Sequence, residues 1–295
     1  MAEVGSVYIE GAALEFSWAD PRRNLMELIY DTVSKAVESE RTIVAAWGRA
    51  SEHDVEELSR QLFDRIFLAP LGLQETHICA VNAQKWRING GDTSSVEAAQ
   101  KRRAVAAKAN PRALQSGGWR STPAYPLESD HLPLWADAVA AVVISGKPSS
   151  VRVKGLGLSS EPYWPGDRGL ATAPALQRAS ERALAEAGMT AHEIDLFELD
   201  GMTLYDEAIA LEAVGYAAKG QGMRVLAEDQ RCNPSGGSAA GYSVPAMGLA
   251  RIVEATLQLR ATAGAVQVGK PRTAMASGLS VTAAQTQTVI ILEAQ

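Results

Sequence analysis

Apolar positions in the second half of the chain follow the two periods that strands and helices require. Val151–Leu158 alternates residue by residue, as in a strand with one buried face. Leu170–Gly188 places apolar residues three and four positions apart, and Gly188 is a typical residue at a helix C-terminus. Further strands are predicted at Ile194–Leu199, Arg272–Ser277 and Thr286–Leu292, and helices at Leu204–Val214 and Gly248–Thr262. This alternation predicts a layered α/β fold containing parallel strands.

The first half begins in the same way but is less complete. We expect a strand at Val7–Ala12, an amphipathic helix at Leu25–Val37 and a buried strand at Arg41–Gly48. Then follow helices at Ser51–Phe67, Glu75–Trp86 and Ser95–Ala109, an irregular loop at Pro123–Leu134 and a strand at Ala138–Ile144. The element order predicts two α/β halves, residues 1–148 and 149–295, related as an asymmetric repeat.

Composition narrows the class of protein. A chain of 295 residues with 46% hydrophobic and 21% charged residues can bury a substantial core. The net charge of −6 argues against nucleic acid as the main partner, because phosphate binding favours a basic surface. The local basic cluster Lys101-Arg102-Arg103 is interpreted as a solvated helix face.

The chain shows none of the patterns that mark export, membrane insertion or metal binding. Met1–Ser6 lacks a basic region followed by an apolar one, and no apolar run approaches the roughly 18 residues of a membrane span. Cys79 and Cys232 are far apart, and the four histidines lack metal-ligand spacing. We therefore expect a cytoplasmic protein with free thiols, no metal and no membrane span.

A glycine-rich loop leading into a helix is the most specific motif. Asn233–Gly237 reads N-P-S-G-G, and Gly241–Gly248 leads into the predicted helix. This pair resembles the thiolase signature, in which N-P-S-G-G precedes G-H-P-x-G-A-x-G. Trp135–Ile144 is similar to the S-D-G-A-A-A-V-V-L strand of lipid-transfer thiolase-like proteins, and Glu198–Glu207 is similar to their E-L-H-D-x-F segment. The resemblance implies a five-layered α/β/α/β/α fold with an abbreviated first half.

The chain departs from that family where thiolase chemistry requires particular side chains. The family uses a nucleophilic Cys, a late Cys and two His residues. Here Tyr242 replaces the His of G-H-P, Asp200 replaces the His of E-L-H-D, and Ser277–Ala283 contains no Cys. The segment that should carry the nucleophile is missing or, in another alignment, carries Ala13 in its place. Claisen chemistry needs a thiolate and donors for the enolate oxygen, so thiolase activity is not expected.

The resemblance also supplies candidate site residues. Tyr242 and Asp200 are the catalytic candidates, the first as a hydroxyl donor and the second as a base. Asn233, Ser235, Gly236, Gly237 and His131 are candidates for substrate binding. Each has a structural alternative: Tyr242 or Asp200 as a loop cap, the glycines as turn residues, and His131 as an isolated exposed histidine.

Three functions are compatible with these features. The first is a subunit without thiolase activity in a heteromeric acyl-CoA-processing complex, paired with an intact thiolase-like chain. The second is a retro-aldolase (a C–C lyase) acting through Tyr242 on a 3-hydroxyacyl-CoA such as a steroid side-chain thioester, with a zinc-ribbon/OB-fold partner. The third is an acyl-CoA or lipid carrier. Coenzyme A thioester is expected as substrate or ligand, and no further cofactor is expected.

Overall fold

Seven strands of the computed structural model form one mixed sheet in the order β2-β3-β1-β4-β7-β6-β5. The structure describes residues 6–17, 32, 35, 42–48, 51, 63–64, 66–280 and 283–295. The strands are β1 (Val7–Ser17), β2 (Thr42–Gly48), β3 (Asp137–Ser145), β4 (Val151–Ser160), β5 (Leu196–Glu198), β6 (Thr273–Leu279) and β7 (Thr286–Ala294). Only β5 and β6 pair in parallel among these strands; the other pairings are antiparallel.

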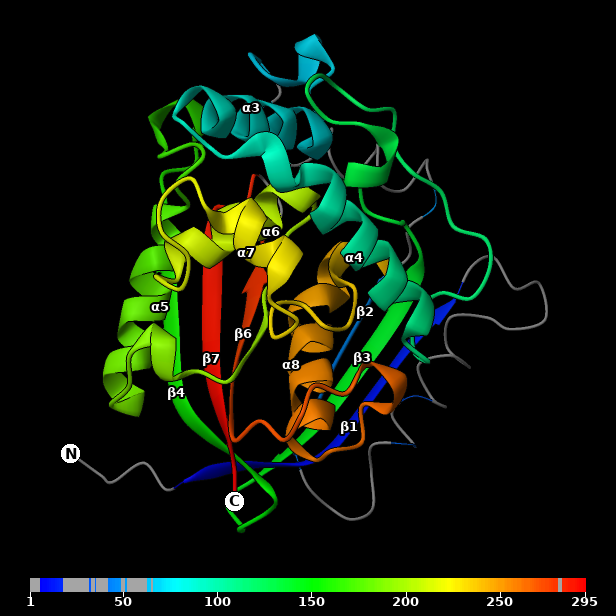
Figure 1. The fold of residues 1–295 in the computed structure, drawn as a ribbon, viewed down its shortest axis with the longest axis vertical. Helices are drawn as coiled ribbons and strands as arrows, with labels where there is room; N and C mark the ends of the chain where they lie inside the picture. The colour runs from blue at the N-terminus through cyan, green and yellow to red at the C-terminus, as the bar shows by residue number, and fades with distance from the viewer. Residues whose placement is uncertain are drawn as a thin grey trace.

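The two halves of the sheet meet at a short antiparallel pairing between β1 and β4. Val7–Ile9 pairs with Val151–Val153, while β1 otherwise pairs with β3 and β4 with β7. Both strands carry a register shift close to this junction. In β1 it lies between Ile9 and Gly11, in the pairing with β3, and in β4 it lies between Val153 and Gly155, in the pairing with β7. Such irregularities increase local twist. Accordingly, β1 and β3 run obliquely to β6 and β7 (Figure 1).

The helices pack on this sheet and on one another. They are α3 (Glu75–Ile88), α4 (Val96–Ala109), α5 (Pro174–Ala187), α6 (Leu204–Ala213), α7 (Gly222–Glu228) and α8 (Met247–Leu259). Helix α8 contacts strands of both halves, namely β1, β3 and β5 to β7, while α5 packs on β4 and β7. Helices α3, α4, α6 and α7 lie above α8 on the near side in Figure 1. The core therefore joins the two predicted halves through α8.

Most predicted elements in the described ranges are confirmed, with two differences. Strand β2 is an exposed edge of the sheet, not a buried strand, since Ile43 is 40% and Trp47 48% exposed. Helix α7 was not predicted, because its short sequence between two loops carries little periodicity. The predicted helix Leu25–Val37, apart from residues 32 and 35, and most of Ser51–Phe67 lie outside the described residues.

The basic cluster on α4 is only partly solvated. Lys101 is exposed, but Arg103 is 1% exposed and Arg102 donates to the backbone carbonyl of Cys232 at 2.6 Å. The interpretation of all three as a solvated face is therefore wrong. Arg103 is buried because acceptors from distant segments surround its guanidinium.

Gly157→Ala should destabilise the protein, because β4 and α5 approach each other without room for a side chain. A Cβ on Gly157 would lie 1.8 Å from the Ala179 carbonyl oxygen. Overpacking of this kind costs about 1–3 kcal/mol. Chemical denaturation can measure the loss, with Gly146→Ala as the control, since a Cβ at exposed Gly146 meets nothing within 4 Å. A Gly157→Ala protein as stable as the Gly146→Ala protein would contradict the described packing.

Candidate functional site

A cavity of about 80 Å³ lies where α3, α6, the end of β6 and the 161–171 loop come together. Four acidic residues, Glu75, Glu161, Asp200 and Asp206, and the thiol of Cys79 lie on its wall. Much of the remaining wall is apolar, formed by Ile78, Leu170, Ala171, Ala173, Leu176, Met202, Ile209, Ala210 and Leu279. Acids in a small, mostly apolar cavity are suited to proton transfer, because burial shifts their pKa toward neutrality.

Hydrogen bonds between three segments form one side of this cavity. The backbone N–H of Ala283 donates to the Glu75 carboxylate at 2.8 Å, and Arg168 Nη1 donates to the Ala283 carbonyl at 2.9 Å. Arg168 also donates to the Pro162 carbonyl at 2.6 Å, and Glu75, Arg168 and Ala283 all line the cavity. The start of α3, the loop before α5 and the β6–β7 connection are thereby tied together.

Asp200 lies two residues after the end of β5 and is almost fully buried. Its backbone N–H donates to Ser277 Oγ at 2.9 Å, and its Oδ2 accepts the Leu279 N–H at 3.3 Å. Oδ1 has no hydrogen-bond partner of regular geometry among the described atoms. Burial raises the pKa of Asp200 to about 6, against the opposing effects of the Arg251 charge, the Leu279 N–H and the Tyr242 hydroxyl. Asp200 can therefore both hold and accept a proton near neutral pH.

Tyr242 is fully buried and is not part of the described cavity wall. Its ring packs edge-on against Trp135, with centroids 5.4 Å apart. Its hydroxyl lies close enough to Asp200 to lower the carboxyl pKa, although it has no hydrogen bond of regular geometry in this arrangement. Burial and the Asp200 charge raise the pKa of Tyr242 further above its usual value, so the phenol stays neutral. The structure thus brings the two catalytic candidates together but exposes only Asp200 to the cavity.

The polar groups of the Asn233–Gly237 loop are taken up by a buried network. Ser235 donates through its N–H and its Oγ to the Glu198 carboxylate, at 3.0 and 2.7 Å. Arg251 Nη1 bonds both Glu198, at 3.1 Å, and Ser235 Oγ, at 2.8 Å. Asn233 accepts the Leu199 N–H at 2.7 Å and donates to the Leu199 carbonyl at 3.0 Å. These contacts give Asn233 and Ser235 a structural role, and neither lines the Asp200 cavity.

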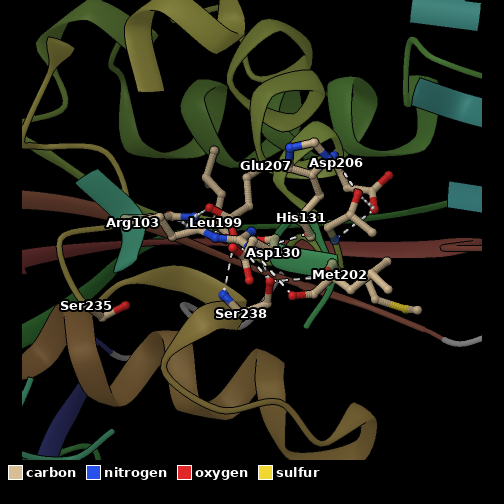
Figure 2. Close-up of polar contacts among 12 residues, drawn as sticks. Arg103, Asp130, His131, Leu199, Met202, Asp206, Glu207, Ser235 and Ser238 are labelled. Atoms are coloured by element: carbon tan, nitrogen blue, oxygen red, sulfur yellow. Dashed lines mark hydrogen bonds and ion pairs between the residues drawn. The ribbon is translucent and has the colours of Figure 1, made fainter. Parts of the chain in front are cut away.

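The two glycines of the loop allow close packing around a buried ion pair. A Cβ on Gly236 would lie 2.5 Å from the backbone of Ala107, and one on Gly237 would lie 2.3 Å from Glu207 Oε1. Glu207 pairs with Arg103 at 3.2 Å and accepts the Ser238 N–H at 3.1 Å. Figure 2 shows Arg103, Glu207 and Ser238 converging. Both glycines also have positive φ, so packing and backbone conformation together explain them.

His131 is buried rather than exposed, with 3% of its surface accessible. Its Nδ1 accepts the Glu128 N–H at 3.0 Å, and its ring packs edge-on against Tyr205 at 5.6 Å. Burial lowers its pKa, which favours the neutral ring. The expectation of an isolated exposed histidine is wrong, because a turn over Ser129–His131 folds the side chain inward. His131 does not line the Asp200 cavity.

The two cysteines are free and buried. Burial raises the pKa of Cys79, as do the nearby charges of Asp206 and Glu75, and burial raises the pKa of Cys232 to about 12. Both are therefore thiols rather than thiolates at neutral pH. Sequence reasoning did not select Cys79 or Asp206 as cavity residues; the only signal was that Asp206 belongs to the same segment as Asp200.

The described residues offer no metal site and no membrane-spanning segment. No group of three or more His, Cys, Asp or Glu side chains in the described ranges is arranged to hold a metal ion. Among the same residues, no helix has the length and apolar character needed to cross a bilayer.

Sequence comparisons place the second half among thiolase-related proteins. Residues 166–294 match the thiolase C-terminal domain-like family. A segment of 113 residues is 30% identical to sterol carrier protein 2 of Homo sapiens, and covers 36% of this chain and 21% of that protein. A segment of 98 residues is 35% identical to an acetyl-CoA acetyltransferase of Methanothermobacter thermautotrophicus, and covers 30% of this chain and 26% of that protein. The matches thus span less than a third of these relatives.

Structural comparisons extend the similarity over the whole chain. The fold matches a chain of the Ltp2-ChsH2(DUF35) aldolase with a TM-score of 0.76 and 16% identity over 98% of both chains. It matches the monomeric SCP2-thiolase-like protein type 1 of Mycobacterium smegmatis with a TM-score of 0.69 and 13% identity, over 98% of this chain and 78% of that one. Human mitochondrial 3-ketoacyl-CoA thiolase gives a TM-score of 0.63 at 13% identity, over 99% of both chains. The thiolase-like α/β fold class predicted from the sequence is confirmed.

Proposed function

The chain is a thiolase-superfamily protein of the SCP2-thiolase-like kind, and from this premise we propose that it is the lyase subunit of a heteromeric acyl-CoA-processing complex. Its substrate is a 3-hydroxyacyl-CoA, which it cleaves by a retro-aldol reaction. The observation that carries the proposal is Asp200: a buried carboxylate with a pKa of about 6, on the wall of a small cavity that holds no thiolate among the described residues. The fold shared with the Ltp2-ChsH2(DUF35) aldolase supports the proposal.

The reaction needs a base at the 3-hydroxyl group and hydrogen-bond donors for the oxygen of the developing enolate. Asp200 removes the hydroxyl proton, a carbonyl forms at C3, and the C2–C3 bond breaks. Its electron pair passes to C2, giving the thioester enolate, which is then protonated to a shorter acyl-CoA. Tyr242 acts through Asp200: its neutral hydroxyl stabilises the ionised carboxylate from the protein interior and so positions the base.

Thiolysis is disfavoured at this site for two physical reasons. Acyl transfer to sulfur requires a thiolate, and the pKa of Cys79 lies well above its usual value because of burial and neighbouring acids. An ionised Asp200 would also repel a developing oxyanion at the position where the family carries histidine. A retro-aldol step needs neither a thiolate nor free coenzyme A. The chain is therefore proposed to lack thiolase activity.

The lyase rate should rise with pH through about 6 and level off above about 7. Asp200 must be ionised to accept the hydroxyl proton, and its pKa in the folded protein is about 6. The rate of a single turnover, measured from pH 4.5 to 8.5, reports this step. A profile that falls as pH rises through 6, or that still has its midpoint near 4, would contradict Asp200 as the base.

A non-catalytic subunit is the second candidate, and the exposed edge of the sheet favours it. Ile43, Val44 and Trp47 leave large apolar surfaces exposed on β2, whose only described sheet neighbour is β3. An apolar sheet edge is suited to pairing with another chain. The proposed partners are an intact thiolase-like chain or a zinc-ribbon/OB-fold protein. In the non-catalytic case, substitution of Asp200 would leave the activity of the complex unchanged, whereas the lyase proposal requires its loss.

A further inference from the structure

Asp206 is, with Glu75 and Glu161, one of three further acidic residues on the wall of the Asp200 cavity. It lies in the first turn of α6, where its Oδ2 accepts two hydrogen bonds from Thr203, from N–H at 3.0 Å and from Oγ1 at 2.7 Å. The Asp206 N–H donates back to Thr203 Oγ1 at 3.3 Å, which completes a capping box. Both hydrogen bonds from Thr203 end on the same carboxylate oxygen. Capping therefore fixes the position of the group through Oδ2.

Retro-aldol cleavage needs two proton transfers at different atoms. The first removes the proton from the 3-hydroxyl, and the second adds a proton to C2 of the enolate. Asp200 has just accepted the first proton when the enolate forms. It lies next to the 3-hydroxyl oxygen in this step, whereas the second proton must reach C2, a different atom of the substrate. A second acid in the same cavity suits the second transfer.

We propose that Asp206 is the acid that protonates C2 of the thioester enolate, a role that rests on the proposed lyase function. The Asp206 O–H bond breaks, its proton forms the new C2–H bond, and Asp206 is left ionised. Asp200 leaves the step protonated, so the enzyme has moved one proton from Asp206 to Asp200. Exchange of protons with water restores both acids, and no other co-reactant is required.

The pKa of Asp206 is raised above its usual value, in the direction that suits a proton donor. Burial raises its pKa, against the opposing effects of the Thr203 hydroxyl and the Cys79 thiol. The nearby charge of Glu207 raises it further. From α3, Cys79 faces Asp206 as a neutral thiol, and the Glu75 carboxylate lies on the same cavity wall.

Hydrogen–deuterium exchange at C2 tests this proposal separately from C–C cleavage. Cavities of about 150 Å³ hold benzene, so a cavity of about 80 Å³ suits a short acyl group. The probe is propionyl-CoA in D₂O with the native complex, followed by mass spectrometry. Wild type should introduce deuterium at C2. Asp206→Asn should lower the exchange rate by about 100-fold or more. Asp200→Asn should keep exchange close to wild type while losing cleavage of the 3-hydroxyacyl-CoA.

Two controls separate the acid from the helix cap and from the thiol. Thr203→Ala breaks the capping box but leaves the Asp206 proton, so exchange should persist in the less stable protein. The Cys79→Ala protein should also exchange deuterium at C2 of propionyl-CoA. Exchange at the wild-type rate in Asp206→Asn, or its loss in Cys79→Ala alone, would overturn the proposal. If the wild-type protein cleaves the 3-hydroxyacyl-CoA but exchanges no deuterium at C2 of propionyl-CoA, the role of Asp206 is also overturned. If it does neither, the proposed lyase function itself is wrong.

Discussion

Asp200→Asn is expected to lower the rate of C–C cleavage by about 10²–10⁴-fold, because it removes the base but keeps the shape of the side chain. The assay is single-turnover cleavage of a 3-hydroxyacyl-CoA by the complex purified from its native source. The variant should remain folded. Burial raises the pKa of Asp200 from 3.8 to about 6, so the folded state binds this proton more tightly than the unfolded state. Ionisation therefore costs stability as pH rises through 6, and Asn avoids that cost.

Tyr242→Phe is the matched comparison for that result. Its hydroxyl lowers the pKa of Asp200, so its removal should move the midpoint of the pH–rate profile above 6. The rate on the alkaline plateau should fall by less than in Asp200→Asn, because Tyr242 is not on the described cavity wall. An unchanged rate in Asp200→Asn would mean that this chain is not the lyase. A Tyr242→Phe variant with an unshifted midpoint would show that Tyr242 does not position the base.

Arg103→Met is expected to be the most destabilising of the substitutions considered, at about 3–5 kcal/mol. The pair with Glu207 is buried on both sides, and Arg103 also donates to the carbonyls of Asp130, at 3.0 Å, and His131, at 3.2 Å. Methionine would leave Glu207 as an unpaired buried carboxylate next to Gly237. A fall of roughly 6 °C or more in melting temperature follows from the usual 2–4 °C per kcal/mol.

Lys154→Met is the control for Arg103→Met. Lys154 pairs with Glu293 at 2.6 Å, but both side chains remain partly exposed, at 25% and 23%. Exposed pairs contribute about 0–1 kcal/mol, so this variant should melt close to wild type. Equal melting temperatures for the two variants would show that the Arg103–Glu207 pair does not hold α4, α6 and the glycine-rich loop together.

The arrangement of strands and helices was predictable because it follows local periodicity. Val151–Leu158 and Thr286–Leu292 alternate and become β4 and β7, and the apolar stripe after Gly248 becomes α8. Whether a strand is buried does not follow from its local periodicity. The apolar residues of Arg41–Gly48 read as buried, yet β2 has a described neighbour on one side only. Whether a strand is central or at an edge depends on which strands pair, and the sequence does not state this.

The site was only partly predictable for a related reason. Asp200 and Tyr242 were identified from their motif positions, and the structure brings them together. The roles of Glu198, Glu207 and Arg103 were missed, because their partners lie tens of residues away or more: Arg103 and Glu207 are 104 positions apart. Ser235 was assigned to substrate because its motif resembles a binding loop. In the structure its donors are directed at Glu198, which only the packing of α8 and β5 reveals.

Product analysis without added coenzyme A tests the central claim most directly. The native complex is mixed with a 3-hydroxyacyl-CoA, and the products are measured by mass spectrometry with either wild type or Asp200→Asn as the chain described here. We predict one carbonyl product and one shorter acyl-CoA for each substrate consumed, with no requirement for free coenzyme A and with loss of both products in Asp200→Asn. Cleavage that depends on free coenzyme A, or that continues at the wild-type rate in Asp200→Asn, would contradict a retro-aldol lyase built on Asp200.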